Sequence, residues 1–222
     1  MKRIGIAVLS AASLLAAGTA AAAEPQWNYG QIGWIQVDGP EDNGEGDGFK
    51  IDGSIGFLEN YHFQLSYEDG SLDGTPNDDD WDGYRTALGF HQAINSAGNT
   101  QFIANINYFD IDFDEDGGEG VYDGSASGYG LGFGLRSMIS EKVELEGMID
   151  WTKGEYDYDN GYFSDEDYTD TTLSVGGRYH WMPNISTGLK IVLNAGDQTD
   201  SFGYGDAALL DLRYSFGSDI SK

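Results

Sequence analysis

The chain has 222 residues, with 38 acidic against 11 basic side chains, a net charge of −27 and no cysteine. The lack of cysteine excludes a disulfide framework and a thiolate metal site. The negative charge argues against nucleic acid as a partner, because phosphate binding needs clustered Lys and Arg. An aromatic content of 14% is too high for a disordered acidic chain, so composition indicates a folded domain.

Residues 1–23 have the organisation of a secretory signal peptide. Lys2 and Arg3 form a basic start, residues 4–15 are an apolar core, and the four alanines that end the segment offer a small-residue cleavage site. An uncleaved anchor is the alternative, but the apolar core is short for a membrane span. We expect residues 1–23 to be removed and residues 24–222 to form one domain, since no linker composition divides them.

The first strand is expected over residues 27–37, and its orientation stays open between two phases. Ile32 and Trp34 share one face of such a strand, whereas Ile35 and Val37 share the other. Successive side chains of a strand point to opposite faces, so only one of these two pairs can lie on the outer face of the sheet. The sequence does not choose between them.

Nine further segments alternate apolar with polar or small residues more clearly, and each therefore predicts a strand with one apolar face. Short connections follow the second, fourth, sixth and eighth strands. Longer, acid-rich connections follow the first, third, fifth, seventh and ninth. The nine segments are residues 48–57, 61–68, 81–91, 100–111, 129–136, 143–151, 171–181, 185–194 and 208–216, and the long connections are residues 38–47, 69–80, 112–123, 152–168 and 195–204.

An even strand count with alternating short and long connections is typical of an antiparallel, transmembrane up-and-down β-barrel. A secreted, soluble sandwich also alternates, but its outer face meets water and has no reason for this pattern of connections. A charge that faces lipid at the midplane costs roughly 2–4 kcal/mol, and the apolar faces of these strands carry none between their tips. We therefore predict an all-β barrel of ten strands whose apolar faces meet lipid.

The opposite, inward face carries twelve charged residues, six of each sign, which we expect to pair as a charge network in the lumen. Aromatic residues gather near the predicted strand ends, in two belts that suit the two membrane–water interfaces. The expected network is Lys50, Asp52, Glu68, Arg85, Arg136, Glu144, Glu146, Asp150, Arg178, Lys190, Asp211 and Arg213. The expected belts are Tyr67, Tyr84, Tyr108, Tyr129 and Trp151 toward the long connections, and Phe57, Tyr61, Phe90, Tyr179, Trp181 and Phe216 toward the short ones.

The signal peptide, strand runs such as residues 48–57 and the aromatic-ended strand over residues 210–216 resemble small bacterial outer-membrane β-barrel proteins of the OmpA/OmpX-like and porin-like group. The resemblance covers the whole mature chain. It implies a place in the Gram-negative outer membrane, with membrane lipid, lipopolysaccharide and the barrel-assembly machinery as partners. By resemblance Phe216 is the terminal aromatic signal for assembly, although residues 217–222 follow it. Many members have eight strands, which is the alternative to ten.

One acidic connection partly matches a calcium-binding loop. Between Asp112 and Asp123, the side chains of Asp114 and Asp116 precede Gly117, and Asp123 holds the twelfth position. Carboxylates supply hard oxygen ligands, and the glycine permits a sharp turn. The last ligand is Asp rather than Glu and the flanks are strands, so we expect a solvated acidic loop with no cofactor, and keep calcium as the alternative.

The three histidines, His62, His91 and His180, are expected to face the lumen near the short connections. We expect them to pair with nearby carboxylates; a proton-linked gate is the alternative, since histidine titrates near neutral pH. No nucleophile and base come together at the long-connection end, so the sequence predicts no catalytic residue, no metal ligand and no enzyme.

A barrel of ten strands is intermediate in size between eight-stranded barrels, whose interior is filled by side chains, and barrels of sixteen or more strands, which hold a water channel. We expect a narrow or plugged lumen in an envelope or surface protein with at most small-solute or cation passage. The alternative function is a surface adhesion or ligand-binding barrel that acts through its acidic extracellular loops. The sequence does not specify an oligomeric state.

Overall fold

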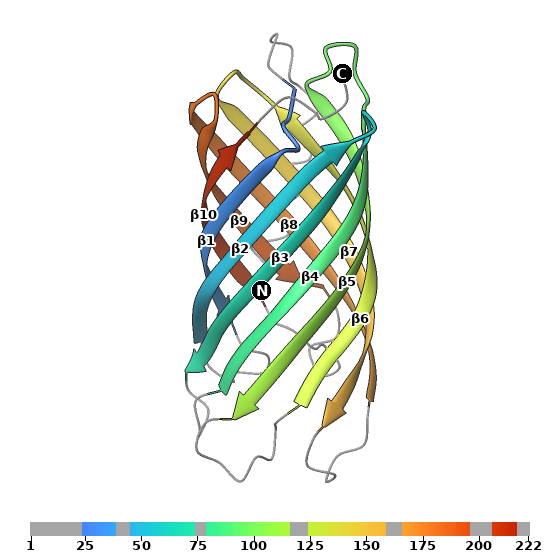
Figure 1. The fold of residues 1–222 in the computed structure, drawn as a ribbon, viewed down its shortest axis with the longest axis vertical. Coiled ribbons are helices and arrows are strands. Elements are labelled where there is room, and N and C mark those ends of the chain that lie inside the picture. The colour runs from blue at the N-terminus through green and yellow to red at the C-terminus, as the bar shows by residue number, and fades with distance from the viewer. Residues whose placement is uncertain are drawn as a thin grey trace.

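The computed structural model describes residues 24–38, 45–73, 79–115, 124–158, 166–195 and 206–216. Over these ranges the chain forms ten strands that close into an antiparallel barrel (Figure 1). No helix in the described residues is long and apolar enough to cross a membrane. The predicted signal peptide, residues 1–23, lies outside these ranges. The strands are β1 (Tyr29–Asp38), β2 (Glu45–Phe57), β3 (Tyr61–Asp73), β4 (Asp79–Ala93), β5 (Thr100–Glu115), β6 (Gly124–Met138), β7 (Val143–Tyr158), β8 (Glu166–Met182), β9 (Ile185–Asn194) and β10 (Ala207–Ser215).

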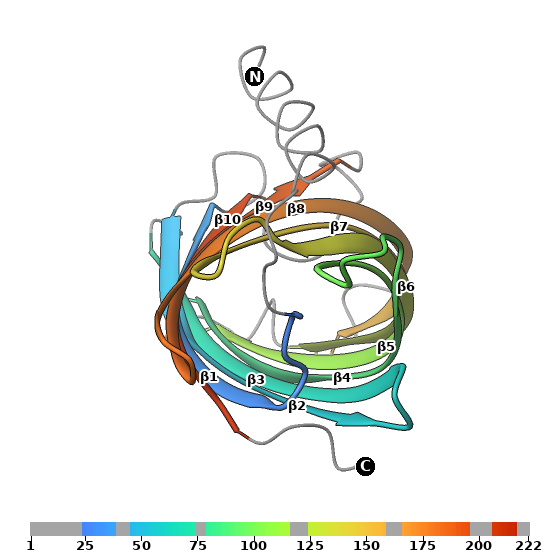
Figure 2. The same ribbon diagram turned by 90° about the horizontal axis from the view of Figure 1, so that it is seen from above.

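Each strand pairs with the strands before and after it in the chain, and β1 pairs with β10 to close the ring (Figure 2). The closing register runs from Tyr29 opposite Ser215 to Val37 opposite Ala207. Closure gives both edges of every strand a partner, which lipid requires because it cannot hydrogen-bond an open sheet edge. The prediction of ten strands, rather than eight, is confirmed.

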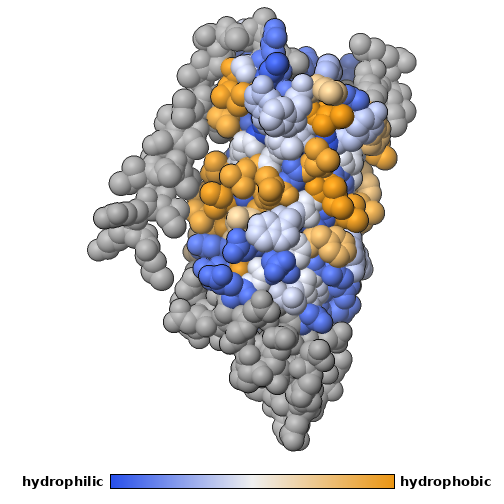
Figure 3. Space-filling view, turned by 90° about the vertical axis from the view of Figure 1, so that its left-hand side faces the viewer, coloured by the Kyte–Doolittle hydropathy of each residue, from blue (hydrophilic) through white to orange (hydrophobic). Residues whose placement is uncertain are grey.

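On the face shown in Figure 3, apolar residues gather over the middle of the outer wall, and hydrophilic residues are more frequent toward its ends. Side chains predicted to face outward are exposed, among them Ile106 at 62%, Leu210 at 55% and Phe133 at 52%. The aromatic residues expected in the belts lie in the same outward phase, and Tyr67, Tyr129 and Trp181 are exposed. This is the surface that a lipid-facing barrel presents.

The structure settles the orientation of the first strand. Ile32 and Trp34 are exposed on the outer wall, whereas Ile35 and Val37 are buried in the interior. The predicted start of this strand was wrong, because β1 begins at Tyr29 and not at Trp27. The residues before Tyr29 leave the wall, and Trp27 is buried at 4% exposure.

The strands extend further toward the long connections than the alternation predicts. β3 continues to Asp73 and β4 begins at Asp79, so most of the predicted loop over residues 69–80 is strand. β5 likewise reaches Glu115 within the predicted loop over residues 112–123. Toward the long connections the outward positions become acidic, as at Asp82 and Asp112, while inward positions such as Trp81 stay buried, so the strands continue beyond the end of the apolar outer face.

Replacement of Ile106 by Arg would place a charge on the lipid face of β5, between Phe102 and Tyr108. We expect the free energy of unfolding from a lipid bilayer to fall by about 2–4 kcal/mol, which is the cost of such a charge near the midplane. Urea titration of folded, bilayer-inserted protein measures this difference. The control, Ile106→Val, removes one methylene group and should cost about 1 kcal/mol. Equal losses in the two variants would contradict a lipid-facing Ile106.

Candidate functional site

The barrel encloses a cavity of about 330 Å³. All twelve charged residues that the sequence places on the inward face line this cavity. They come from β2, β3, β4, β6, β7, β8, β9 and β10, so no single hairpin builds the site. The cavity is therefore the candidate functional site, and its polar contacts determine what can enter it.

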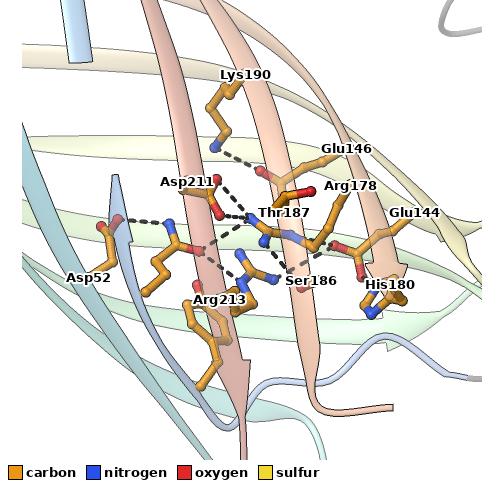
Figure 4. A network of polar contacts seen from close by, with 12 residues as sticks. Asp52, Glu144, Glu146, Arg178, His180, Ser186, Thr187, Lys190, Asp211 and Arg213 are labelled. Carbon is orange, nitrogen blue, oxygen red and sulfur yellow. Dashed lines mark hydrogen bonds and ion pairs between the residues drawn. The ribbon is translucent and has the colours of Figure 1, made fainter. Parts of the chain in front are cut away.

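Glu144 of β7 lies at the centre of a cluster of cations (Figure 4). Its Oε1 is 2.9 Å from Nη2 of Arg136, 3.7 Å from Nη1 of Arg213 and 3.8 Å from Nε of Arg178. Its Oε2 is 3.8 Å from Nε2 of His180. Glu144 and Arg136 are only 3% and 2% exposed, so their attraction is little screened by water.

A glutamine joins this cluster to a second group of charges. The side-chain amide of Gln31 donates to Asp52, at 2.8 Å, and its carbonyl oxygen accepts from Arg213 Nε, also at 2.8 Å. The same oxygen accepts from Arg178 Nη2 at 3.3 Å. Arg178 also lies 2.7 Å from Oδ1 of Asp211. Gln31 was not among the predicted site residues, because an uncharged residue carried no signal in a search for balanced charges.

Other pairs extend or stand apart from the cluster. Glu146 Oε1 lies 2.8 Å from Nζ of Lys190, and Lys50 and Glu68 form a separate pair at 2.9 Å. Among the described residues, Arg85 and Asp150 make no ion pair within 4.0 Å; the Arg85 guanidinium instead lies 5.4 Å from the ring centre of Phe109. The twelve residues therefore share one cavity without forming one continuous network.

Inward glycines make room for the large charged side chains beside them. A Cβ atom on Gly188 would lie 2.7 Å from both Arg178 Nη2 and Asp211 Oδ2, which are in contact with each other across it. A Cβ on Gly132 would meet the Asp150 carboxylate. The glycines at these two positions therefore accommodate their charged neighbours and do not leave open space.

Trp27 fills the interior at the short-turn end. Its ring stacks on His62 and His91, with ring centres 4.0 and 4.4 Å away and planes 18° and 17° apart. The Arg136 guanidinium lies 4.8 Å from the Trp27 ring centre, and the indole Nε1 donates to Gln101 at 2.8 Å. The blue segment that precedes β1 runs into the ring of strands in Figure 2.

The expected pairing of a histidine with a carboxylate holds for His180. His180 lies beside Glu144, but the Nδ1 atoms of His62 and His91 lie 3.2 Å from each other. Both rings are buried and stack against Trp27. The sequence placed Trp27 in a strand, and so this contact was missed.

Apolar residues, rather than charges, line the interior toward the long-connection end. One cluster contains Ile35, Val37, Trp81, Ala207 and Leu209, and another contains Phe109, Ile111, Ala126 and Tyr168. The sequence predicts that these side chains point inward once the outward residues of each strand are known. Trp81, for example, lies three positions before the outward Tyr84 and therefore on the opposite face. The charged layer thus lies between the Trp27 contact and these apolar clusters.

The described residues contain no group of three or more His, Cys, Asp or Glu side chains that could hold a metal ion. Most of the segment considered for calcium, residues 116–123, lies outside the described ranges. The calcium alternative therefore stays a prediction.

The family model described as "Outer membrane protein beta-barrel domain" matches residues 5–180. No curated protein matches the sequence. Among solved structures, the β domain of the Bordetella autotransporter BrkA is 10% identical with a TM-score of 0.54, covering 86% of this chain and 100% of that one. The KdgM porin is 12% identical with a TM-score of 0.43, covering 84% and 99%. At these identities the likeness shows the barrel fold alone.

Replacement of Glu144 by Gln would leave three buried guanidinium groups without their shared carboxylate. We expect the free energy of unfolding to fall by about 3–5 kcal/mol, because an uncompensated buried charge is costly. Urea titration of the folded barrel in bilayers measures the loss. The matched control on the same strand, Glu155→Gln, changes an exposed residue and should stay within about 0.5 kcal/mol of the wild type. A loss for Glu144→Gln no larger than that of the control would contradict the cluster's role.

Proposed function

Because the chain belongs to the outer membrane protein beta-barrel domain family, we propose that it is an integral protein of the Gram-negative outer membrane with a lumen closed to all but small solutes. Its role is structural, at the envelope or cell surface, with at most the passage of small cations. Outer-membrane lipid and lipopolysaccharide surround it in this proposal.

The observation that carries the proposal is the filling of the barrel interior. Trp27 and its partners fill the lumen at the short-turn end, and the Glu144 cluster fills the next layer of the lumen. The cavity that they leave, about 330 Å³, compares with the smallest ligand pockets and is far from an aqueous channel. Porins of sixteen to eighteen strands, by contrast, leave an aqueous channel through the barrel.

Any passage should favour cations over anions. The cavity is lined by seven carboxylates, among them Asp150 and Asp170, against six Lys and Arg side chains, so its lining carries a small excess of negative charge. The net charge of −27 also raises the local concentration of cations near the protein surface. Both effects act in the same direction, so anionic solutes are disfavoured at the mouth and within the lumen.

The proposal includes export through the signal peptide at residues 1–23 and insertion by the barrel-assembly machinery. Phe216 follows β10 directly and is 45% exposed on the outer wall, where a protein that recognises the end of the chain can reach it. Phe216 also donates its backbone N–H to the Asn28 carbonyl, at 3.0 Å, so the seam between the first and last strands ends beside it.

A surface adhesion or ligand-binding barrel is the second candidate, and the acidic outer wall at the long-connection end favours it. Asp69 lies opposite Asp82, and Asp82 lies opposite Asp112, on neighbouring strands. Like charges directly opposite each other destabilise a sheet, so this row has a cost that a cationic partner would offset. Such a partner would meet these strands from outside the barrel.

Planar-bilayer recording tests the proposed function. We expect purified, folded protein at pH 7.5 in potassium chloride to show no steady conductance of the size given by a large porin, since its lumen is filled. A large porin reconstituted in the same lipid is the control, and folding is checked by the gel mobility of unboiled against boiled samples. A steady, porin-sized conductance from the wild type would overturn the closed-lumen proposal.

A further inference from the structure

We propose that the lumen cavity holds a binding site for a small zwitterion of the α-amino acid class, with Arg85 and Asp150 as its two charged contacts. The inference rests on the proposed function, because it treats the lumen as a closed chamber and not as an open channel. It adds a class of ligand to that function. Three features carry it: two opposite charges that do not pair, the glycines in the wall between them, and a buried amide beside them.

Arg85 and Asp150 differ from the other inward charges. The other ten residues of the charge network each make an ion pair or a side-chain hydrogen bond. Arg85 and Asp150 line the same cavity, but within the part of the chain that the structure describes neither makes an ion pair within 4.0 Å. A guanidinium group offers five N–H donors and a carboxylate offers two acceptor oxygens, so both side chains have capacity for a ligand.

The two side chains attract each other across a gap. Arg85 exerts the strongest attraction on the Asp150 carboxylate, followed by Lys190, which is already 2.8 Å from Glu146 Oε1. Arg85 stands on β4 and Asp150 on β7, with β5 and β6 between them in the wall (Figure 2). Three strand spacings of about 4.8 Å separate the two backbones along the wall, about 14 Å in all. A molecule placed between the side chains can therefore contact both.

The wall between them carries glycine at two inward positions of β6. A Cβ atom on Gly130 would lie 2.8 Å from Asn107 Oδ1, and a Cβ on Gly132 would meet the Asp150 carboxylate. The side chains of Asn107, from β5, and Asp150, from β7, thus lean over neighbouring positions of the strand that separates them. The glycines bring these two polar groups onto one patch of the cavity wall.

The Asn107 amide is the buried polar group of this patch. Asn107 lines the cavity and is only 5% exposed, and its Oδ1 has no hydrogen-bond partner among the described residues. A buried polar group without a partner is costly, so a donor supplied by a ligand would be favourable here. The terminal torsion of an asparagine is soft, so a small rotation can present this oxygen to a ligand.

The combination of contacts selects a ligand that carries both charges. A simple cation would satisfy Asp150 and leave Arg85 without a partner, and a simple anion would do the reverse. An α-amino acid carries both groups on one carbon: its carboxylate accepts from Arg85, and its ammonium group donates to Asp150 and Asn107. The cavity of about 330 Å³ lies at the lower end of the range for ligand pockets, which suits so small a molecule. Trp27 fills the short-turn end, so in this proposal the ligand enters from the long-connection end.

Isothermal titration calorimetry of the whole, folded protein in detergent tests the site with three matched probes. L-alanine carries both charges, propionate lacks the ammonium group and ethylamine lacks the carboxylate. We expect saturable binding of L-alanine, and binding at least about tenfold weaker for propionate and for ethylamine, because each leaves one charged contact unmade.

Two variants assign the contacts. In Asp150→Asn the advantage of L-alanine over propionate should vanish, because the contact to the ammonium charge is gone. In Arg85→Gln its advantage over ethylamine should vanish for the corresponding reason. The matched control Asp157→Asn makes the same change as Asp150→Asn at an exposed position of β7 and should bind all three probes as the wild type does.

The outcomes separate the site from the proposed function. A wild type that shows no saturable binding of L-alanine, or that binds the three probes equally, overturns the site and leaves the closed lumen standing. A steady, porin-sized conductance overturns the closed lumen itself, whatever the calorimetry gives. Variants that keep the wild-type preferences overturn the roles of Arg85 and Asp150. Heat-modifiable gel mobility checks folding, and the three probes on the wild type decide the ligand class even if a variant does not fold.

Discussion

A strand that crosses lipid must find a partner for each backbone N–H and C=O group within the protein, and this requirement governs the architecture. β1 and β10, the two ends of the strand order, pair over nine residue positions and leave no edge in the described wall. Once the sheet is closed, the pleat divides its side chains into two sets. One set meets hydrocarbon, and the other must fill an enclosed space.

The enclosed space is filled in layers, and each layer follows from what burial permits. A buried charge is costly unless it is paired or hydrogen-bonded, and Arg136, Arg178 and Arg213 converge on Glu144. Glycines beside them supply the room that these long side chains need. At the short-turn end the chain uses aromatic stacking instead, with Trp27 between the histidine pair and Arg136. The aromatic contact closes the lumen at this end.

The sequence predicted the features that depend on alternation and missed those that depend on contacts across strands. The outward phase of Ile106 and Phe133 was readable because each strand repeats its pattern several times. The position of Trp27 inside the lumen could not be predicted, because a single aromatic residue at the end of a strand fits the outer wall as well as the interior. The choice of partner within the lumen was equally hidden, because Glu144 reaches Arg213 only through the registers of four strands, β7 to β10. The strand ends near the long connections were missed because the prediction followed apolar outward positions, and these give way there to acidic residues such as Asp82 and Asp112.

The central claim, that apolar side chains face lipid around a charged interior, is tested most directly by single cysteines on β5. The chain has no cysteine, so one introduced at 104, 105, 106 or 107 carries the only label. A fluorophore on each folded variant is exposed to nitroxide groups on the lipid chains. The account predicts strong quenching at 104 and 106 and weak quenching at 105 and 107. Uniform quenching, or the opposite alternation, would contradict it.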